Sequence, residues 1–150
     1  MSKTWGTPTW LYFHSLAEQI DSKFYMDNRV EILNYIKKIC SCLPCPDCTK
    51  HATQYLNKIG INKLKTKEDL KMMLFNFHNS VNERTKKPKF TNLSMYERSR
   101  IDLIYSEFRK QYLINKIQNR GFNDTLHRKK IIENLDKFMT DNIDKFKHFS

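Results

Sequence analysis

All four cysteines of this 150-residue chain fall within the nine-residue stretch "CSCLPCPDC", which spans positions 40 to 48. His51 follows three residues after the last of them. Three thiolates and an imidazole can bind zinc, whereas a Cys-x-x-Cys pair can exchange disulfides with another dithiol. In a reducing compartment, clustered cysteines are more often metal ligands or redox catalysts than structural crosslinks. The cluster is therefore consistent with either metal binding or disulfide exchange, and the spacing of its residues helps to choose between them.

The metal interpretation fits the spacing poorly. Structural zinc sites usually combine ligand pairs from separate segments, but the candidates Cys42, Cys45, Cys48 and His51 lie within ten residues. On a helix, a strict three-residue spacing also rotates steadily away from one face. An iron–sulfur cluster meets the same difficulty, and no remote fourth cysteine exists for it. We therefore predict no bound metal.

The redox interpretation explains more of the sequence. Pro46 suits the first turn of a helix, which would place Cys45 at or near the N-cap of that helix. Unpaired backbone N–H groups and the helix dipole would stabilise a thiolate there, as thiol–disulfide exchange at neutral pH requires. Thioredoxin-like proteins place such a pair in a βαβ setting, which this chain lacks.

A second group of chemically capable residues lies in "FHNSVNERTKKPKF", residues 77–90. His78 and Asn82 are four residues apart and share a helix face, which could bind a planar heterocycle or simply make surface hydrogen bonds. The basic stretch that follows could hold a pyrophosphate or be a solvated charge run. Trp10 and His14 are also four apart, and they could stack on an adenine ring or pack in the core. The basic residues concerned are Arg84, Lys86, Lys87 and Lys89.

Apolar residues recur at helical spacing in six segments, and no segment shows β-type alternation. We expect an all-α protein: a compact four- to five-helix bundle with an extra C-terminal helical segment. The expected domains are a core at 1–113 and a basic helical extension at 114–150. The helices are predicted at 8–21, from about Ile32 to Leu43, from Cys45 to Lys58, after the Thr66-x-x-Asp69 cap, from Ile101 to Tyr112, and from Ile132 to Ile143.

The net charge of +11 fits nucleic acid, an anionic ligand or an acidic partner and does not choose among them. No apolar run approaches membrane-spanning length, and "MSKTWGTPTW" has no signal-peptide core. We expect a cytoplasmic protein without membrane contact. A basic zinc-binding helical module for nucleic acid is the alternative function, but it leaves residues 77–90 unexplained, so nucleic acid is not the expected partner.

Three blocks together resemble the Erv/ALR family of FAD-linked sulfhydryl oxidases, above all the forms encoded by large cytoplasmic DNA viruses. They are "WGTPTWLYFHSL", "LPCPDCTKHA" and "FHNSVNERTKKPKF", and they occur in the family's order over residues 5–90. The third is the most specific, since it is similar to the family's His-Asn-x-Val-Asn…Lys-Pro-x-Phe pattern. The family binds FAD inside a helical bundle, which agrees with the lack of a Gly-x-Gly-x-x-Gly motif here.

The resemblance implies an oxidase that makes disulfides and passes electrons through FAD to O2, giving hydrogen peroxide. It implies that Cys45 exchanges with the substrate while Cys48 lies against the flavin. It further implies a thioredoxin-like or other dithiol protein as substrate, a homodimer, and work in the host cytoplasm or the virion. The residues it implies for FAD binding are Gly6, Trp10, His14, His78, Asn79, Val81, Asn82, Lys86, Lys89 and Phe90.

The chain also departs from the family. Many relatives tie their N-terminal region to a C-terminal cysteine, but no residue from 49 to 150 is a cysteine. The usual distant pair that shuttles electrons is missing too. Cys40 and Cys42 could form a Cys-x-Cys shuttle, or they could be a buried thiol and a bystander.

Overall fold

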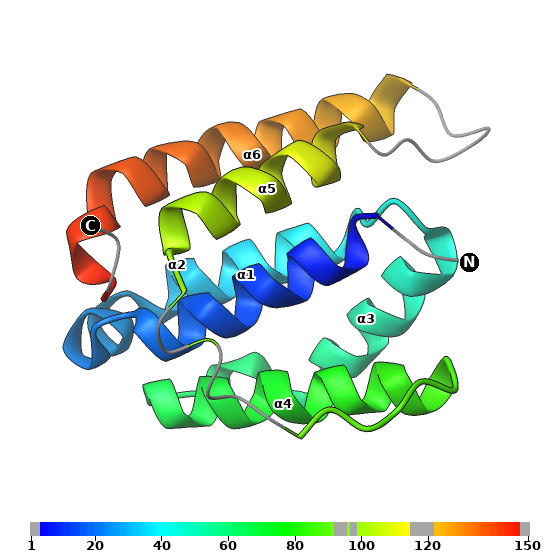
Figure 1. The fold of residues 1–150 in the computed structure, drawn as a ribbon, viewed down its shortest axis with the longest axis horizontal. Coiled ribbons are helices and arrows are strands. Elements are labelled where there is room, and N and C mark those ends of the chain that lie inside the picture. Colours follow the sequence, from blue (N-terminus) through cyan, green and yellow to red (C-terminus); the bar gives the residue numbers. More distant parts are fainter. Residues whose placement is uncertain (1–3, 92–95, 97–98, 115–121, 148–150) are drawn as a thin grey trace.

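A computed structural model describes residues 4–91, 96, 99–114 and 122–147, and these residues fold almost entirely into helices (Figure 1). No β-strand forms among them, and the all-α prediction is confirmed. In chain order the elements are α1 (Gly6–Gln19), α2 (Ser22–Cys40), α3 (Pro46–Ile59), η1 (Ile61–Lys63), α4 (Lys67–Arg84), α5 (Ile101–Ile114), α6 (Phe122–Asn142) and η3 (Ile143–Lys145).

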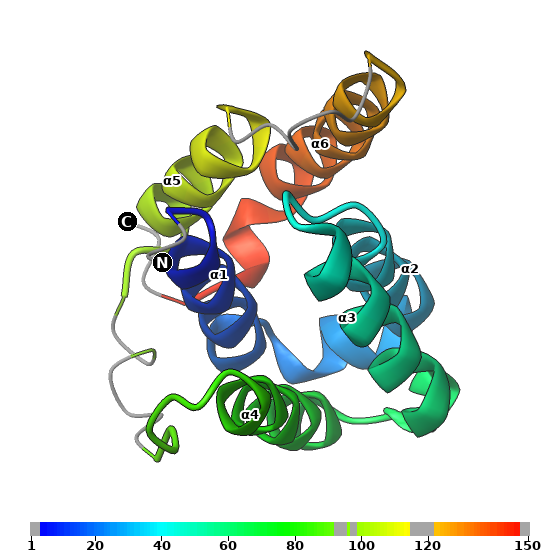
Figure 2. The ribbon, with the colours of Figure 1, turned by 90° about the vertical axis from the view of Figure 1, so that its right-hand side faces the viewer.

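The helices lie in three layers (Figure 1). The middle layer is α1 and α2; α5 and α6 cover one side of it, and α3 and α4 cover the other. The view along the bundle shows α1, α3 and α4 arranged around a common centre, with α2 behind α3 (Figure 2). Burial of apolar faces such as those of Phe13, Ile39 and Leu70 holds the layers together. The start of α1, the start of α3 and the end of α4 lie toward the same end of the bundle (Figure 1).

Local sequence signals account for several helix ends. Cys45 is the N-cap of α3 with Pro46 in the first turn, as predicted. The Thr66 hydroxyl accepts the amide of Asp69, and the Asp69 carboxylate accepts the amide of Thr66, which completes a capping box at the start of α4. The second helix ends at Cys40 rather than at Leu43. Leu43 precedes Pro44, and a residue before proline disfavours the helical conformation.

The C-terminal helix α6 packs on α2 and α5, and its side chains Ile131, Ile132 and Leu135 are buried in the same core as those of the other helices. The chain then returns to the end of α1. Lys147 N donates to Gln19 O over 2.9 Å, within an isolated antiparallel bridge that pairs Ile20 with Phe146. The division at 113/114 stays a prediction, because the junction at 115–121 lies outside the described residues.

None of the helices in the described ranges combines the length with the hydropathy that crossing a membrane requires.

Candidate functional site

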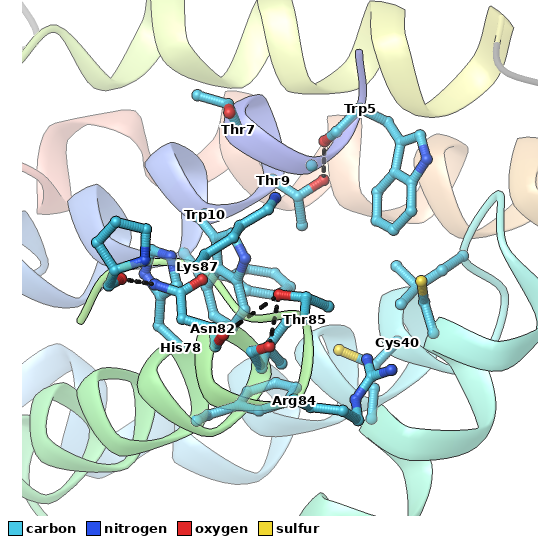
Figure 3. A pocket seen from close by; sticks show the side chains of 18 residues that line it. Trp5, Thr7, Thr9, Trp10, Cys40, His78, Asn82, Arg84, Thr85 and Lys87 are labelled. Carbon is cyan, nitrogen blue, oxygen red and sulfur yellow. Dashed lines mark hydrogen bonds between the residues drawn. The ribbon is translucent and has the colours of Figure 1, made fainter. Parts of the chain in front are cut away.

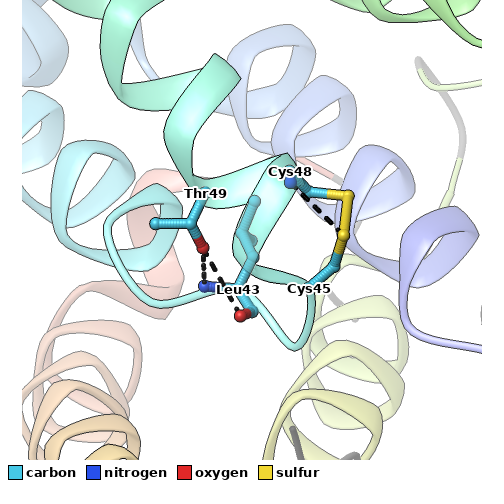
Figure 4. Close-up of a disulfide and its surroundings, with 4 residues drawn as sticks. All are labelled: Leu43, Cys45, Cys48 and Thr49. Atoms are coloured by element: carbon cyan, nitrogen blue, oxygen red, sulfur yellow. Dashed lines mark hydrogen bonds between the residues drawn. A yellow bond between two sulfur atoms is a disulfide. The ribbon is translucent and has the colours of Figure 1, made fainter.

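A disulfide joins Cys45 and Cys48 at the start of α3, with 5.2 Å between the two Cα atoms (Figure 4). Cys45 has an extended backbone, as an N-cap residue does, and its sulfur accepts the backbone N–H of Cys48 over 3.3 Å. The preceding loop is tied to the same helix, because Leu43 N donates to the Thr49 hydroxyl over 2.9 Å. The pair is therefore held at the positive end of a helix dipole by local bonds.

A cavity of about 370 Å³ is bordered by Cys48 of the disulfide. Figure 3 shows the side chains that line this cavity. Its volume lies in the range of small-molecule sites, about 300–1,000 Å³. Cys48 lines the cavity, whereas Cys45 does not, and both are half-buried. The lining comes from α1 with its N-cap, the end of α2, the loop after it, α3, and α4 with the turn that follows: Trp5, Gly6, Thr7, Thr9, Trp10, Phe13, Cys40, Leu43, Cys48, Ala52, Phe77, His78, Val81, Asn82, Arg84, Thr85, Lys87 and Pro88.

Aromatic rings from α1 and α4 stack on one side of this cavity. The Trp10 and His78 rings lie face to face, with centroids 4.2 Å apart and an interplanar angle of 4°. His14 lies outside the lining, where its Nε2 is 2.9 Å from Nδ1 of His78. The Phe90 ring stacks on both histidines, with centroids 5.0 Å from His14 and 4.6 Å from His78. The stack gives the cavity a planar aromatic surface that suits a heterocycle.

Both histidines are neutral at pH 7. Burial, and then the nearby His78, lower the pKa of His14 to about 3. Burial, and then the charge of Lys87, lower the pKa of His78 to about 4. A neutral imidazole keeps one donor and one acceptor nitrogen, so the pair can share a hydrogen bond without placing a charge in the ring stack.

We predict that His14 makes folding stability depend on pH. Its pKa falls from 6.5 in the unfolded chain to about 3 in the folded protein. The stabilising contribution is present above pH 6.5 and is lost as the pH falls toward 3. In His14→Phe, which keeps the ring but cannot titrate, the free energy of unfolding should depend less steeply on pH between 6.5 and 4, by up to about 1.4 kcal/mol per pH unit. Urea titrations across that range measure the slope, and equal slopes in both proteins would contradict the prediction.

The turn after α4 decides which basic side chains reach the cavity. Asn82 Nδ2 donates to Pro88 O over 3.2 Å, and Lys87 N donates to Asn82 O over 2.7 Å, so this turn folds back over Asn82. Lys86 takes the left-handed conformation, with φ 61°. Arg84 and Lys87 line the cavity, while Lys86 is exposed outside the lining.

Asn79 holds the segment beyond that turn. Its side-chain amide donates to Phe90 O over 3.0 Å, and its oxygen accepts Phe90 N over 2.7 Å. Lys89 and Asn79 instead line a neighbouring hollow, which shares Lys87 with the cavity. Of the residues predicted to bind FAD, Gly6, Trp10, His78, Val81 and Asn82 line the cavity beside Cys48; His14, Asn79, Lys86, Lys89 and Phe90 do not.

Several lining residues carried no separate signal in the sequence. Trp5 is buried, and its carbonyl accepts the Thr9 hydroxyl over 2.6 Å at the first turn of α1. Arg84 and Lys87 belonged to the predicted basic stretch, but spacing alone did not distinguish them from their neighbours. Ala52 and Phe77 fit the apolar helix pattern and gave no indication that they face a cavity.

The other two cysteines are buried thiols. Cys40 lines the cavity, and burial raises the pKa of its thiol to about 12. The sulfur of Cys42 lies 3.8 Å from Asp124 O of α6. Within the described part of the chain, no group of three or more His, Cys, Asp or Glu side chains could hold a metal ion.

The shuttle function of Cys40 and Cys42 stays a prediction, and burial is unfavourable to it. Burial keeps the Cys40 thiol protonated, and a protonated thiol is a slow nucleophile in exchange. We therefore expect Cys40→Ala with Cys42→Ala to change oxidation of a protein dithiol and of a small dithiol by the same factor. Oxygen consumption with each substrate measures the two rates. A selective loss with the protein substrate would show that the two thiols shuttle electrons.

The chain resembles known proteins over the part that contains this site. The Erv1 / Alr family profile matches residues 7–100. A protein of Invertebrate iridescent virus 3 named as an FAD-linked sulfhydryl oxidase is 30% identical over 100 residues, covering 66% of this chain and 68% of the relative. The FAD-linked sulfhydryl oxidase of African swine fever virus is 32% identical over 93 residues, covering 62% and 76%. The mitochondrial FAD-linked sulfhydryl oxidase of Saccharomyces cerevisiae is 25% identical over 85 residues, covering 57% and 44%. No solved structure matches the chain at a comparable level of significance.

Proposed function

The chain belongs to the Erv1/Alr family, and we propose from this that it is an FAD-linked sulfhydryl oxidase whose Cys45–Cys48 disulfide oxidises substrate dithiols. One observation carries the assignment of roles. Cys48 lines the cavity, whereas Cys45, at the same end of α3, does not. The two sulfurs therefore differ in what can reach them: a substrate thiol meets Cys45, and a molecule in the cavity meets Cys48.

The residues of the cavity fit FAD by their chemistry. The Trp10 ring, backed by His78, offers a planar surface for a heterocycle, Asn82 offers an amide, and Arg84 and Lys87 offer cations for phosphate oxygens. Because His78 is neutral, the ring stack places no charge behind Trp10. Bound FAD would supply the two-electron redox chemistry that links the cysteine pair to O2 and gives hydrogen peroxide.

The chain's own residues carry out the exchange. A substrate thiolate attacks Cys45 Sγ, the Cys45–Cys48 bond breaks, and Cys48 leaves as a thiolate in the cavity wall. The second substrate thiolate then attacks the substrate sulfur of the mixed disulfide and releases Cys45 as a thiolate. The substrate dithiol is thereby oxidised to a disulfide, and the enzyme disulfide is reduced to a dithiol.

The helix end favours both leaving groups. Cys45 Sγ already accepts the backbone N–H of Cys48, so the thiolate that forms there keeps a donor. Cys48 lies in the first turn of α3, where the helix dipole stabilises negative charge. The N-cap position thus assists each step of the exchange without requiring a separate base.

We also propose the natural context of this reaction. The dithiol donor would be a thioredoxin-like or other dithiol protein, the enzyme would act as a homodimer, and the reaction would proceed in the host cytoplasm. The viral relatives support the location, and the exposed end of α3 supports a protein substrate. Such an enzyme would form disulfides in a compartment that otherwise keeps thiols reduced.

The absorbance spectrum of the purified protein together with an oxygen electrode tests the proposal. We expect a yellow protein with a flavin spectrum that consumes O2 and produces hydrogen peroxide when dithiothreitol is added. A colourless protein that contains stoichiometric zinc and consumes no O2 would overturn it and favour a zinc-binding module instead.

A further inference from the structure

Another hollow, smaller than the cavity and open to solvent, runs between α3 and α4 beside the cavity. Its volume is about 220 Å³, and four residues from each helix line it. Phe77, Val81 and Arg84 line both this groove and the cavity that Cys48 borders, so α4 separates the two. We name this hollow the α3–α4 groove.

The α3–α4 groove has an aromatic floor and a cationic rim. The Tyr55 and Phe77 rings stack in the floor, with centroids 4.8 Å apart and an interplanar angle of 13°. His51, Lys58 and Arg84 line it and are exposed. None of the lining residues is Asp or Glu, and within the described ranges none of these three side chains forms an ion pair. The groove therefore offers positive charge with no acidic partner from its own lining.

The position of the α3–α4 groove relates it to the exchanging cysteine. His51 and Lys58 follow Cys45 by six and thirteen residues along α3. At about 1.5 Å per helical residue, they lie about 9 Å and about 20 Å farther along the helix. An extended chain that starts at Cys45 and advances about 3.3 Å per residue would pass both within about three to six residues.

We propose that the α3–α4 groove binds an acidic segment of the dithiol substrate, about three to six residues from the cysteine that attacks Cys45. This inference rests on the proposed function and adds a preference among its substrates. Carboxylates of the segment pair with Lys58 and accept a hydrogen bond from His51, while an apolar or aromatic side chain packs on Tyr55. The unassigned His51 of the "LPCPDCTKHA" block thereby gains a place in substrate recognition.

Three synthetic dithiol peptides of equal length test the preference. Each carries one Cys-x-x-Cys pair, flanked on both sides by Glu and Asp, by Gln and Asn, or by Lys. At low ionic strength we expect kcat/KM for the acidic peptide to exceed that for the neutral one by about tenfold, as a few partly exposed ion pairs would give. The basic peptide should be the poorest, and added salt should reduce the differences because it screens exposed charges.

Two matched variants separate the groove from the general attraction of a +11 protein. Lys58→Glu reverses a charge in the α3–α4 groove, and Lys129→Glu makes the same change at an exposed site on α6. We expect Lys58→Glu to remove most of the preference for the acidic peptide, and Lys129→Glu to keep it. Equal kcat/KM for acidic and neutral peptides in the unmodified enzyme, or equal losses in both variants, would overturn the proposal.

Dithiothreitol oxidation keeps the two proposals distinguishable. It should be unchanged in both lysine variants, because a small dithiol makes no use of the groove. If the unmodified enzyme fails to oxidise dithiothreitol, the oxidase assignment fails. A peptide-binding measurement then still tests whether the α3–α4 groove binds an acidic segment. The probe is a fluorescent acidic peptide with Ser in place of both cysteines, and its binding is measured by fluorescence anisotropy. It should bind the unmodified protein and Lys129→Glu more tightly than it binds Lys58→Glu. Equal binding to all three would overturn the groove.

Discussion

We expect Cys45→Ser and Cys48→Ser each to lose dithiol-dependent oxygen consumption and to keep FAD bound. Among the described residues, Cys45 and Cys48 form the only disulfide. Each variant lacks one of these two sulfurs, so the enzyme disulfide cannot form again after it has been reduced. We expect a loss of at least about a hundredfold, since removing one member of a covalent catalytic pair disables the whole unit. The flavin should remain, because Trp10, His78 and Asn82 are untouched. Oxygen consumption with dithiothreitol and the flavin-to-protein absorbance ratio measure the two effects.

Cys42→Ser is the matched control, since it removes a sulfur from the same segment but not from the disulfide. It should retain turnover. The two active-site variants should also differ from each other after reaction with a thiol-trapping reagent. Cys45→Ser leaves a thiol in the cavity wall, where bound FAD shields it, whereas Cys48→Ser leaves the outer one. Turnover near the unmodified rate in either variant would rule out the proposed route of electrons.

The sequence was sufficient to predict the features of this site that are fixed locally. Pro46 after Cys45 predicts an N-cap, and the structure places Cys45 there, because capping depends on the few residues around a helix start. The stacking of Trp10 on His78 joins two helices far apart in the chain. No rule based on sequence spacing predicts that Trp10 and His78 are in contact, and only the family resemblance placed both at one site.

The features that depend on tertiary contacts were not predictable. Spacing could not decide which basic residues between 84 and 89 face the cavity, because the chain leaves its helix at Arg84. The turn is then fixed by the bond from Asn82 to Pro88 and by the left-handed backbone of Lys86. The same limit applies to Asn79, whose amide pairs with the backbone of Phe90 and so supports the fold of the segment. The packing of α6 on α2 and α5 likewise requires long-range contacts that periodicity cannot supply.

We expect Arg84→Ala with Lys87→Ala to release FAD on dilution. Both side chains line the cavity and are exposed toward solvent, where they can reach phosphate oxygens. A charged hydrogen bond to phosphate contributes about 1.5–3 kcal/mol, which corresponds to about ten- to more than a hundredfold in affinity for each contact. The double variant should therefore bind FAD at least about a hundredfold more weakly. Its melting temperature should also fall toward that of the FAD-free protein, because a bound ligand stabilises the folded state.

Lys86→Ala with Lys89→Ala removes the same charge from the same segment and is the matched control. The family resemblance predicts that these two lysines bind FAD, whereas the structure leaves both outside the cavity lining. Flavin fluorescence during serial dilution, with melting curves at several FAD concentrations, compares the two double variants directly. Retention of FAD in the control and its loss from the Arg84 and Lys87 variant would assign the phosphates to the residues at the cavity. The opposite result would mean that the turn after α4 rearranges on binding to bring Lys86 inward, since its left-handed backbone at φ 61° is the conformation that would have to change.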